Sequence, residues 1–218
     1  MTNTISKENY LKTILQHTTD TNEPVTTNDI ANTMGTKAAS VTEMLKKLSA
    51  QKLIKYKKYK GVTLTNSGRQ QALLIIRKHR LWEYFLVEKL KFRWDEIHEV
   101  AEQLEHIQSD ILVDRLNLFL ENPQFDPHGA PIPNKKGAIK KSETFKLNEV
   151  RDNKESIVKS VSDQPDLLRY LSKIGISIGS KLKVIEQNSF DQSLLLLINN
   201  KVKVQVSSDI AKHIRVQP

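Results

Sequence analysis

Residues 26–54 read TTNDIANTMGTKAASVTEMLKKLSAQKLI, and this stretch decides the fold of the first third of the chain. Its apolar residues recur at helical spacing on both sides of Gly35, which predicts a short helix over about 27–34 and a second over about 37–50. A helix, a glycine-bearing turn and a second helix form the helix-turn-helix pattern. The next residues, LIKYKKYKGVTLT, alternate apolar and polar side chains on either side of KYKG, which predicts a two-stranded hairpin. Together these elements predict a winged helix-turn-helix.

The net charge of +9 is concentrated at the N-terminal end of the 218 residues. Residues 1–80 carry 14 Lys and Arg against five Asp and Glu, whereas the rest of the chain has equal numbers of both. A basic module joined to a neutral remainder is typical of a phosphate-binding domain on a regulatory body. Surface lysines kept for solubility explain the charge equally well.

The residues expected to contact DNA lie around the second helix of the motif and in the hairpin. In a helix-turn-helix, the second helix enters the major groove with its N-terminal residues towards the base edges. Lysines of a wing give affinity for phosphates rather than sequence preference. The candidate DNA-binding residues are Thr36, Lys37, Ser40, Thr42 and Lys46, with Lys57, Lys58 and Lys60 in the hairpin. The alternative is a generic small helical domain with a solvated lysine face.

The remaining chain predicts a mainly α protein with a small β domain. A first helix is expected over 5–17, and two long helices over about 67–90 and about 94–120. Prolines in FDPHGAPIPNKKG, residues 125–137, end the helical structure, and residues 135–146 resemble a linker. From residue 145 onward, the short β-like runs FKLNEV, KLKVIE, SLLLLI and KVKVQV, with the helical segment DLLRYLSKI among them, predict a barrel-like domain of about 75 residues.

Histidine and glutamate side chains gather on the two long predicted helices. They are His79 and Glu83 on the first, and His98, Glu102, Glu105 and His106 on one narrow stripe of the second. For a single i, i+4 pair, ordinary surface charge is the better interpretation, but six such residues on neighbouring helices predict a metal site. The chain has no cysteine, so the ligands have to be histidine, carboxylate, amide or carbonyl groups.

Two other classes of protein have weaker support. Residues 98–102, HEVAE, miss the zinc-protease pattern HExxH because Glu102 takes the place of the second histidine. A metallohydrolase also leaves the basic N-terminal module unexplained. No apolar run approaches the roughly 18 residues of a membrane span, and the start of the chain lacks the layout of a signal peptide. A cytoplasmic protein without a membrane segment is expected.

The whole chain resembles the longer, three-domain members of the diphtheria toxin repressor family, most closely the manganese-responsive branch. The resemblance rests on motifs in the same order: ENYLKTI (8–14), KAASVTEMLKKL (37–48), GVTLTNSG (61–68), RKHRLWEYFL (77–86), HEVAEQLEHIQSD (98–110) and DPHGAPIP (126–133). It implies a winged helix-turn-helix DNA-binding domain over 1–70 and a helical dimerisation and metal-binding domain over 71–140. Over 145–218 it implies an SH3-like barrel related to ferrous-transport accessory modules.

The function that the resemblance implies is that of a metal-dependent transcriptional repressor, not an enzyme. A homodimer loaded with Mn²⁺ would bind palindromic double-stranded operator DNA and control metal-uptake genes, with Fe²⁺ as the alternative ion. The metal would bridge the first helix to the dimerisation helix and so set the spacing of the two recognition helices. We expect Leu81, Phe85 and Leu112 to contribute to the dimer interface. A metal-independent DNA-binding protein is the remaining alternative.

The resemblance also implies two sets of ligands. The primary site would comprise Asn9, Glu102, Glu105 and His106, and the ancillary site His79, Glu83 and His98, with Asp163 and Gln164 in the region that completes it in some members. Iron-type members have methionine and cysteine where this chain has Asn9 and Glu102, so its harder, oxygen-rich donors suit Mn²⁺ or Fe²⁺.

Two departures from the manganese-type pattern concern the first helix. Asn9 replaces the usual aspartate, with Glu8 beside it to restore the lost charge. Lys12 takes the place of a glutamate found in the short manganese regulators, which argues against their paired-ion arrangement.

Overall fold

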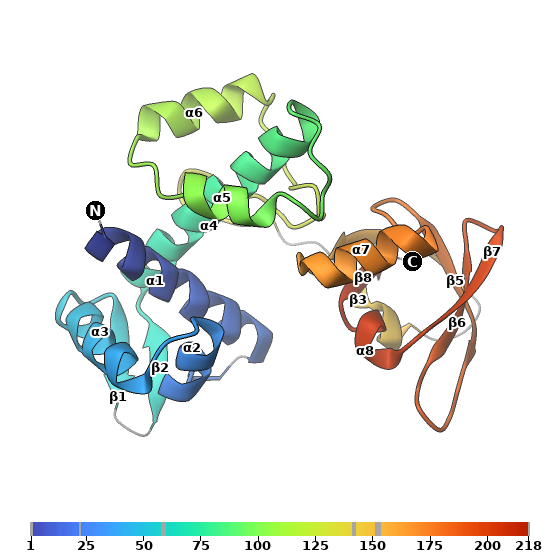
Figure 1. Ribbon diagram of the computed structural model, residues 1–218, viewed down its shortest axis with the longest axis horizontal. Helices are drawn as coiled ribbons and strands as arrows, with labels where there is room; N and C mark the ends of the chain where they lie inside the picture. The colour runs from blue at the N-terminus through green and yellow to red at the C-terminus, as the bar shows by residue number, and fades with distance from the viewer. Residues whose placement is uncertain (1, 22, 58–59, 141–142, 151–153, 218) are drawn as a thin grey trace. The chain divides into compact units, whose positions relative to one another are not determined.

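The predicted helix-turn-helix is present in the structure, a computed structural model that describes residues 2–21, 23–57, 60–140, 143–150 and 154–217 (Figure 1). Helix α1 (Thr2–Thr21) precedes α2 (Thr27–Thr33) and α3 (Ala38–Ala50), and the hairpin pairs β1 (Ile54–Lys57) with β2 (Gly61–Leu64) in antiparallel register. The winged helix-turn-helix is therefore confirmed. Lys58 lies outside the described residues.

Local chemistry explains where α2 begins and ends. The Thr26 hydroxyl accepts a hydrogen bond from the Asp29 amide (3.1 Å), and the Asp29 carboxylate accepts one from the Thr26 amide (3.2 Å). This reciprocal capping box satisfies two amide groups at the start of the helix. After α2, Gly35 adopts φ +59°, a left-handed conformation that favours glycine and that lets the chain turn into α3.

The chain divides into two compact units. The N-terminal unit comprises Met1–His79, Leu104–Asp110 and Pro133–Ile139, and the C-terminal unit comprises Arg80–Gln103, Ile111–Ile132 and Lys140–Pro218. The core of the N-terminal unit buries Leu11 and Ile14 of α1 together with Val41 and Leu45 of α3. This shared core fixes α1 against the recognition helix. The three-domain division over 1–70, 71–140 and 145–218 stays a prediction.

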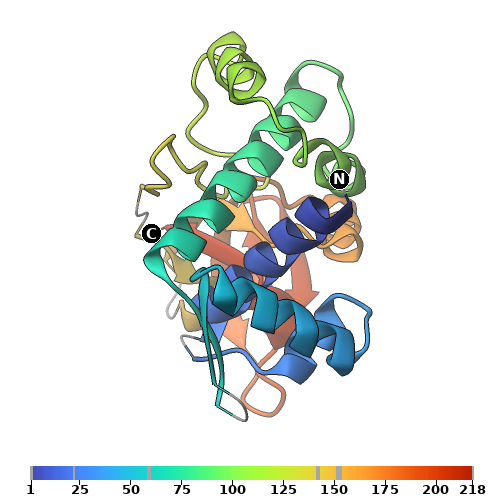
Figure 2. The same ribbon diagram turned by 90° about the vertical axis from the view of Figure 1, so that its left-hand side faces the viewer.

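Helix α4 (Asn66–Glu88) runs unbroken, as predicted (Figure 2). The long helix expected over 94–120 is wrong, because two short helices, α5 (His98–Leu104) and α6 (Asp110–Phe119), replace it. Ser109 and Asp110 are residue types favoured at a helix start, and they begin α6 instead of continuing α5. Glu105 and His106 therefore lie in a turn after α5, so one helical stripe does not carry all four residues of the predicted set.

Leu81 was predicted at the dimer interface, and the structure contradicts this. Its side chain is fully buried within its own chain, among Val113, Leu116 and Leu120. Leu112 remains exposed on α6, and Phe85 is half-buried.

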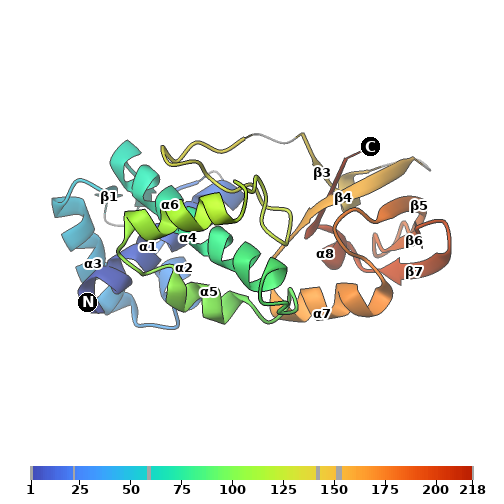
Figure 3. The ribbon, with the colours of Figure 1, turned by 90° about the horizontal axis from the view of Figure 1, so that it is seen from above.

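The small β domain predicted from residue 145 onward is confirmed, and its strands form one six-stranded antiparallel sheet. Its elements are β3 (Phe145–Lys146), a 3₁₀ turn (Leu147–Glu149), β4 (Glu155–Val161), α7 (Pro165–Ile174), β5 (Lys181–Gln187), β6 (Leu194–Ile198), β7 (Val202–Val206), α8 (Ser208–Ala211) and β8 (Ile214–Gln217). The strand order is β3-β8-β4-β5-β6-β7. Helices α7 and α8 flank the sheet and share its core (Figure 3). Within the described residues, no helix is long and apolar enough to cross a membrane.

Candidate metal centre and DNA-binding face

Glu105 is the most deeply buried carboxylate of the predicted primary site. Its side chain has no solvent exposure and is held by hydrogen bonds from two other segments of the N-terminal unit. The Lys12 Nζ atom of α1 donates to both carboxylate oxygens, at 2.7 and 2.9 Å, and the His79 Nδ1 atom of α4 lies 2.6 Å from Oε2. Glu105 thus joins α1 and α4 to the turn after α5.

The surroundings of Glu105 favour its charged form. Burial by itself would raise the pKa of the carboxyl group, but the hydrogen bond from His79 and the positive charge of Lys12 outweigh it. The pKa of Glu105 consequently lies below its usual value. A buried carboxylate kept ionised in this way is a ready ligand for a hard divalent cation.

His106 makes a second link to α1. Its Nδ1 atom lies 2.6 Å from the Glu8 carboxylate, and its Nε2 atom lies 3.8 Å from Oε1 of Glu105. Gln108 donates a further hydrogen bond to Glu8 at 2.9 Å. Histidine ligands of metals usually bind through one ring nitrogen while the other is held by a carboxylate or carbonyl oxygen. Glu8 therefore orients His106 so that Nε2 and the Glu105 carboxylate point to the same place.

Asn9 provides an independent observation that fits a metal site. Its Oδ1 atom is buried and has no hydrogen-bond partner among the described residues. A buried amide oxygen without a partner is costly, and coordination of a cation removes that cost. The residue lies on α1 beside Glu8, in the position that the resemblance assigns to a ligand.

Glu102, the fourth residue of the predicted primary set, lies on α5, three residues before Glu105. Its Oε1 atom is 3.9 Å from Nε2 of His98, one helical turn earlier. In the N-terminal unit the structure brings Glu105 and His106 together with α1, and in the C-terminal unit it pairs Glu102 with a residue of the predicted ancillary set.

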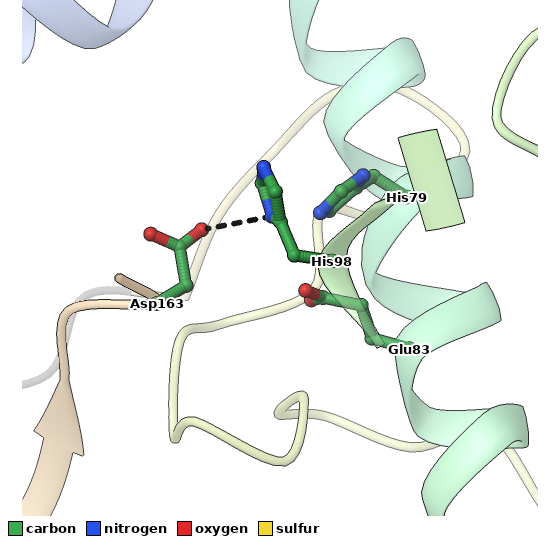
Figure 4. A group of neighbouring side chains, drawn as sticks. All are labelled: His79, Glu83, His98 and Asp163. Atoms are coloured by element: carbon green, nitrogen blue, oxygen red, sulfur yellow. Dashed lines mark ion pairs between the residues drawn. The ribbon is translucent and has the colours of Figure 1, made fainter. Parts of the chain in front are cut away.

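The predicted ancillary residues gather around Glu83 in the C-terminal unit. Glu83, His98 and Asp163 each offer a ligand atom, and these atoms lie within 4.8 Å of one another. The His98 Nδ1 atom is 3.8 Å from the Asp163 carboxylate (Figure 4). His79, drawn in the same figure, lies one turn before Glu83 on α4. Gln164 is exposed at the N-cap of α7, where its side chain makes no capping hydrogen bond.

A further group that the sequence did not predict shares Glu83. Asp126 and His128 are buried with Glu83, and their ligand atoms also lie within 4.8 Å of one another. The His128 Nε2 atom donates a hydrogen bond to the carbonyl oxygen of Trp94 (2.9 Å), because a carbonyl group can only accept. In neutral His128 this leaves a lone pair on Nδ1, which is buried, has no hydrogen-bond partner among the described residues and lies 3.7 Å from Glu83.

The charge balance of this group also fits a cation. Burial, and after it the neighbouring charge of Glu83, raise the pKa of Asp126 to about 6, against the opposing charge of Arg80. Two buried carboxyl groups that resist simultaneous ionisation gain from a divalent cation between them. The signal in the sequence was the DPHG segment, which we interpreted as the end of the helical region and as a motif of the family resemblance, but not as a source of metal ligands. The cluster was not predicted because Asp126 and His128 lie far from Glu83 in the sequence.

The predicted DNA-binding residues lie at the start of α3 and on the hairpin. Thr36, Lys37, Ser40 and Lys46 are exposed, and Lys57 and Lys60 are exposed at the tip of the wing. Thr42 is half-buried, and its hydroxyl donates to the Ala38 carbonyl (2.9 Å). The hydroxyl group of Thr42 is therefore already used within the helix.

Models of three protein families match the chain. Residues 3–62 match the iron dependent repressor N-terminal DNA binding domain, residues 65–134 match the iron dependent repressor metal binding and dimerisation domain, and residues 145–218 match the FeoA domain. Members of the repressor family are transcriptional repressors and not enzymes, so the metallohydrolase alternative is set aside.

Individual relatives agree with this assignment. A manganese-dependent transcriptional repressor in complex with manganese is 38% identical, with a TM-score of 0.87 over 96% of this chain and 98% of that one. The repressor ScaR with bound Cd²⁺ is 36% identical, with a TM-score of 0.86 over 97% and 98%. An uncharacterised HTH-type transcriptional regulator of Methanocaldococcus jannaschii is 37% identical over 116 residues, which span 53% of this chain and 93% of that protein. The chain therefore belongs to the diphtheria toxin repressor family of metal-dependent transcriptional repressors.

Proposed function

We propose that the protein is a manganese-responsive repressor that binds palindromic operator DNA as a homodimer and controls metal-uptake genes. The observation that carries the proposal is the link between α1 and the turn after α5. Glu105 and His106 contact Lys12 and Glu8 of α1, and α1 shares its core with the recognition helix α3. Metal binding at Glu105 can therefore change the position of α1, and α1 can pass this change to α3 through their shared core.

Glu105, His106 and Asn9 would hold the ion, and the resemblance implies Glu102 as a fourth ligand. The ion supplies a positive charge that oxygen and imidazole donors from α1 and from the turn after α5 share. Glu8 keeps the ring of His106 in place, and the packing of Leu11 and Ile14 transmits the position of α1 to α3. A ligand shifts a conformational equilibrium only by its differential affinity for the two states, so donors on both segments are what such a switch requires.

The donor set supports manganese, with ferrous iron as the alternative. Carboxylate, amide and imidazole groups are suited to hard or borderline ions, and the chain offers no thiolate that would favour softer ones. The solved relatives include repressors described as manganese-dependent, while ScaR has been crystallised with Cd²⁺ and Zn²⁺. Intrinsic affinity ranks manganese lowest among the first-row ions, so its availability contributes to selection.

A second ion is proposed at Glu83. The ancillary ligands expected from the sequence, His79, Glu83 and His98, lie on α4 and at the start of α5, with Asp163 beside His98. Asp126 and His128 reach the same carboxylate of Glu83 from the DPHG segment. Glu83 is therefore the residue common to both possible ligand sets.

The proposed dimer uses α6. Ile111, Leu118 and Phe119 on this short helix are 61–70% exposed, which is unusual for large apolar side chains. A two-fold interface over this surface would bury them and would place two recognition helices on one palindrome.

The proposal is tested by titrating operator binding with Mn²⁺ for the wild type and for Glu105→Ala. The probe is a palindromic duplex selected from a random library in the presence of Mn²⁺. We expect Glu105→Ala to need at least about tenfold more Mn²⁺, because a ligand that touches both segments is lost. Glu99→Ala removes an exposed carboxylate from the neighbouring α5 and should keep the wild-type midpoint. Equal midpoints for Glu105→Ala and Glu99→Ala would exclude Glu105 from the switch.

A further inference from the structure

Lys12 places a buried positive charge on the carboxylate that the proposed function assigns to the metal. Its side chain is 8% exposed, and its Nζ atom donates to both oxygens of Glu105. We propose that Lys12 is a built-in competitor of the metal at Glu105, which lowers the affinity of the primary site for Mn²⁺ and so sets the metal concentration at which the repressor binds DNA. This inference rests on the proposed function.

The hydrogen bonds of Glu105 show why the competition is direct. A carboxylate offers about four lone-pair directions on its two oxygens. Lys12 takes one direction on each oxygen and His79 takes another on Oε2, so the remaining direction lies on Oε1. The His106 Nε2 atom is 3.8 Å from this same oxygen, which is within twice a metal–ligand bond of about 2.1 Å.

A divalent cation held by Glu105 and His106 would therefore share Oε1 with the ammonium group of Lys12. Two cations on one carboxylate oxygen repel each other strongly, because little solvent is present to screen the charges. Lys12 cannot move into water without a change in α1, since its neighbour Leu11 is fully buried in the core beside α3. Metal binding at Glu105 thus has to displace the ammonium group of Lys12, which lies on α1, the helix that packs against α3.

The same contact stabilises the fold when Lys12 and Glu105 are paired with each other. A fully buried carboxylate that loses its cationic partner is strongly destabilising. Lys12 consequently has two opposite effects: it supports the metal-free fold and it weakens metal binding. A residue with a purely structural role would have only the first effect, and this difference makes the inference testable.

The test measures Mn²⁺ binding directly, by electron paramagnetic resonance of the free ion, to the full-length protein without DNA. Lys12→Met removes the charge and keeps the apolar stem, while Lys12→Gln removes the charge and keeps a hydrogen-bond donor for Glu105. We expect both to bind Mn²⁺ at least about tenfold more tightly than the wild type. Both should also melt at a lower temperature without metal and gain more from added Mn²⁺. Lys12→Arg keeps the charge and should stay near the wild-type affinity.

Two controls separate the possible failures. Lys7→Met removes the same charge from the same helix and should leave Mn²⁺ affinity unchanged. Glu105→Ala should lose tight binding, and wild-type affinity in that variant would overturn the proposed site itself. If Glu105→Ala loses Mn²⁺ but Lys12→Met and Lys12→Gln bind it no more tightly than the wild type, the inference about Lys12 is overturned while the site stands. If Lys12→Met does not fold, the result for Lys12→Gln decides.

Discussion

At the scale of single residues, the candidate centre depends on buried polar atoms whose hydrogen bonding is incomplete or shared. Asn9 Oδ1 and His128 Nδ1 are buried without hydrogen-bond partners among the described residues, and Glu105 accepts hydrogen bonds from two basic side chains. Such groups are costly in a protein interior unless something compensates them. A cation coordinated by these atoms would remove the cost of burying them, and metal binding would be stronger for that reason.

Asn9→Asp tests the role of the amide oxygen. The substitution adds a negative charge where Oδ1 is buried, so Mn²⁺ should bind more tightly and the metal-free protein should melt at a lower temperature. Both effects are measured by thermal unfolding with and without Mn²⁺. In a Glu105→Ala background the gain in Mn²⁺ affinity should shrink, because the two ligands act on one ion. A gain of the same size in both backgrounds would mean that Asn9 does not belong to this site.

The second ion is tested at Glu83, His128 and His98. Equilibrium dialysis followed by elemental analysis should show one Mn²⁺ fewer per chain for Glu83→Gln, since both possible ligand sets include this residue. His128→Ala should have a larger effect than His98→Ala, because the His128 Nδ1 atom is buried and lacks a hydrogen-bond partner in the described chain whereas the His98 side chain is 35% exposed. The reverse order would assign the ion to His98 and Asp163.

At the scale of elements, we propose that the hairpin and α3 make different kinds of contact with DNA. The residues at the start of α3 are exposed and would read base edges, and the exposed lysines of the wing would contact phosphates. This division predicts different consequences for substitutions in the two elements.

Neutralising Lys57 and Lys60 together should weaken binding to the selected operator and to random duplexes by similar factors. Each lost phosphate contact lowers the slope of log affinity against log salt by about 0.9, so the slope should fall by up to about two units. Ser40→Ala, on the exposed face of α3, should instead change the preferred sequence and leave the salt slope as it was. Titrations at several salt concentrations measure both effects. An unchanged slope in the lysine variant would remove the wing from the interface.

The elements also show what the sequence could predict. Apolar periodicity and Gly35 were sufficient for the helix-turn-helix, because a short motif is specified by local residues. The break between α5 and α6 was missed because helical spacing continues across Ser109 and Asp110. Strand β4 was missed because a bulge between Val158 and Ser160 interrupts the alternation that identifies a strand.

The candidate site was predictable only in part. The ligand types followed from motifs within one segment, such as Glu105 and His106. The contact between Lys12 and Glu105 joins residues 93 apart in sequence, and the Glu83 cluster depends on the return of the DPHG segment to α4. Such contacts are set by tertiary packing and leave no periodic signal in the chain.

At the scale of the whole molecule, two-fold assembly is needed to match a palindrome. Leu118→Glu should give a monomer at micromolar concentration, because it places a charge within the exposed apolar face of α6. Phe190→Glu is the matched control, since Phe190 is 95% exposed in the loop between β5 and β6 and should not affect assembly. Sedimentation velocity measures whether each variant is a monomer or a dimer. A wild-type dimer for Leu118→Glu would place the interface elsewhere.

The central claim is that metal controls DNA binding, and the most direct measurement compares the affinity of the full-length wild type for its selected operator with Mn²⁺ and with a chelator. Coupling between two sites is typically worth a factor of about 5 to 150, so Mn²⁺ should tighten binding by at least about tenfold and the chelator should reverse the effect. Fe²⁺ under anaerobic conditions should act at a different midpoint if the donor set discriminates between the ions. Equal operator affinity with Mn²⁺ and with chelator would contradict the account.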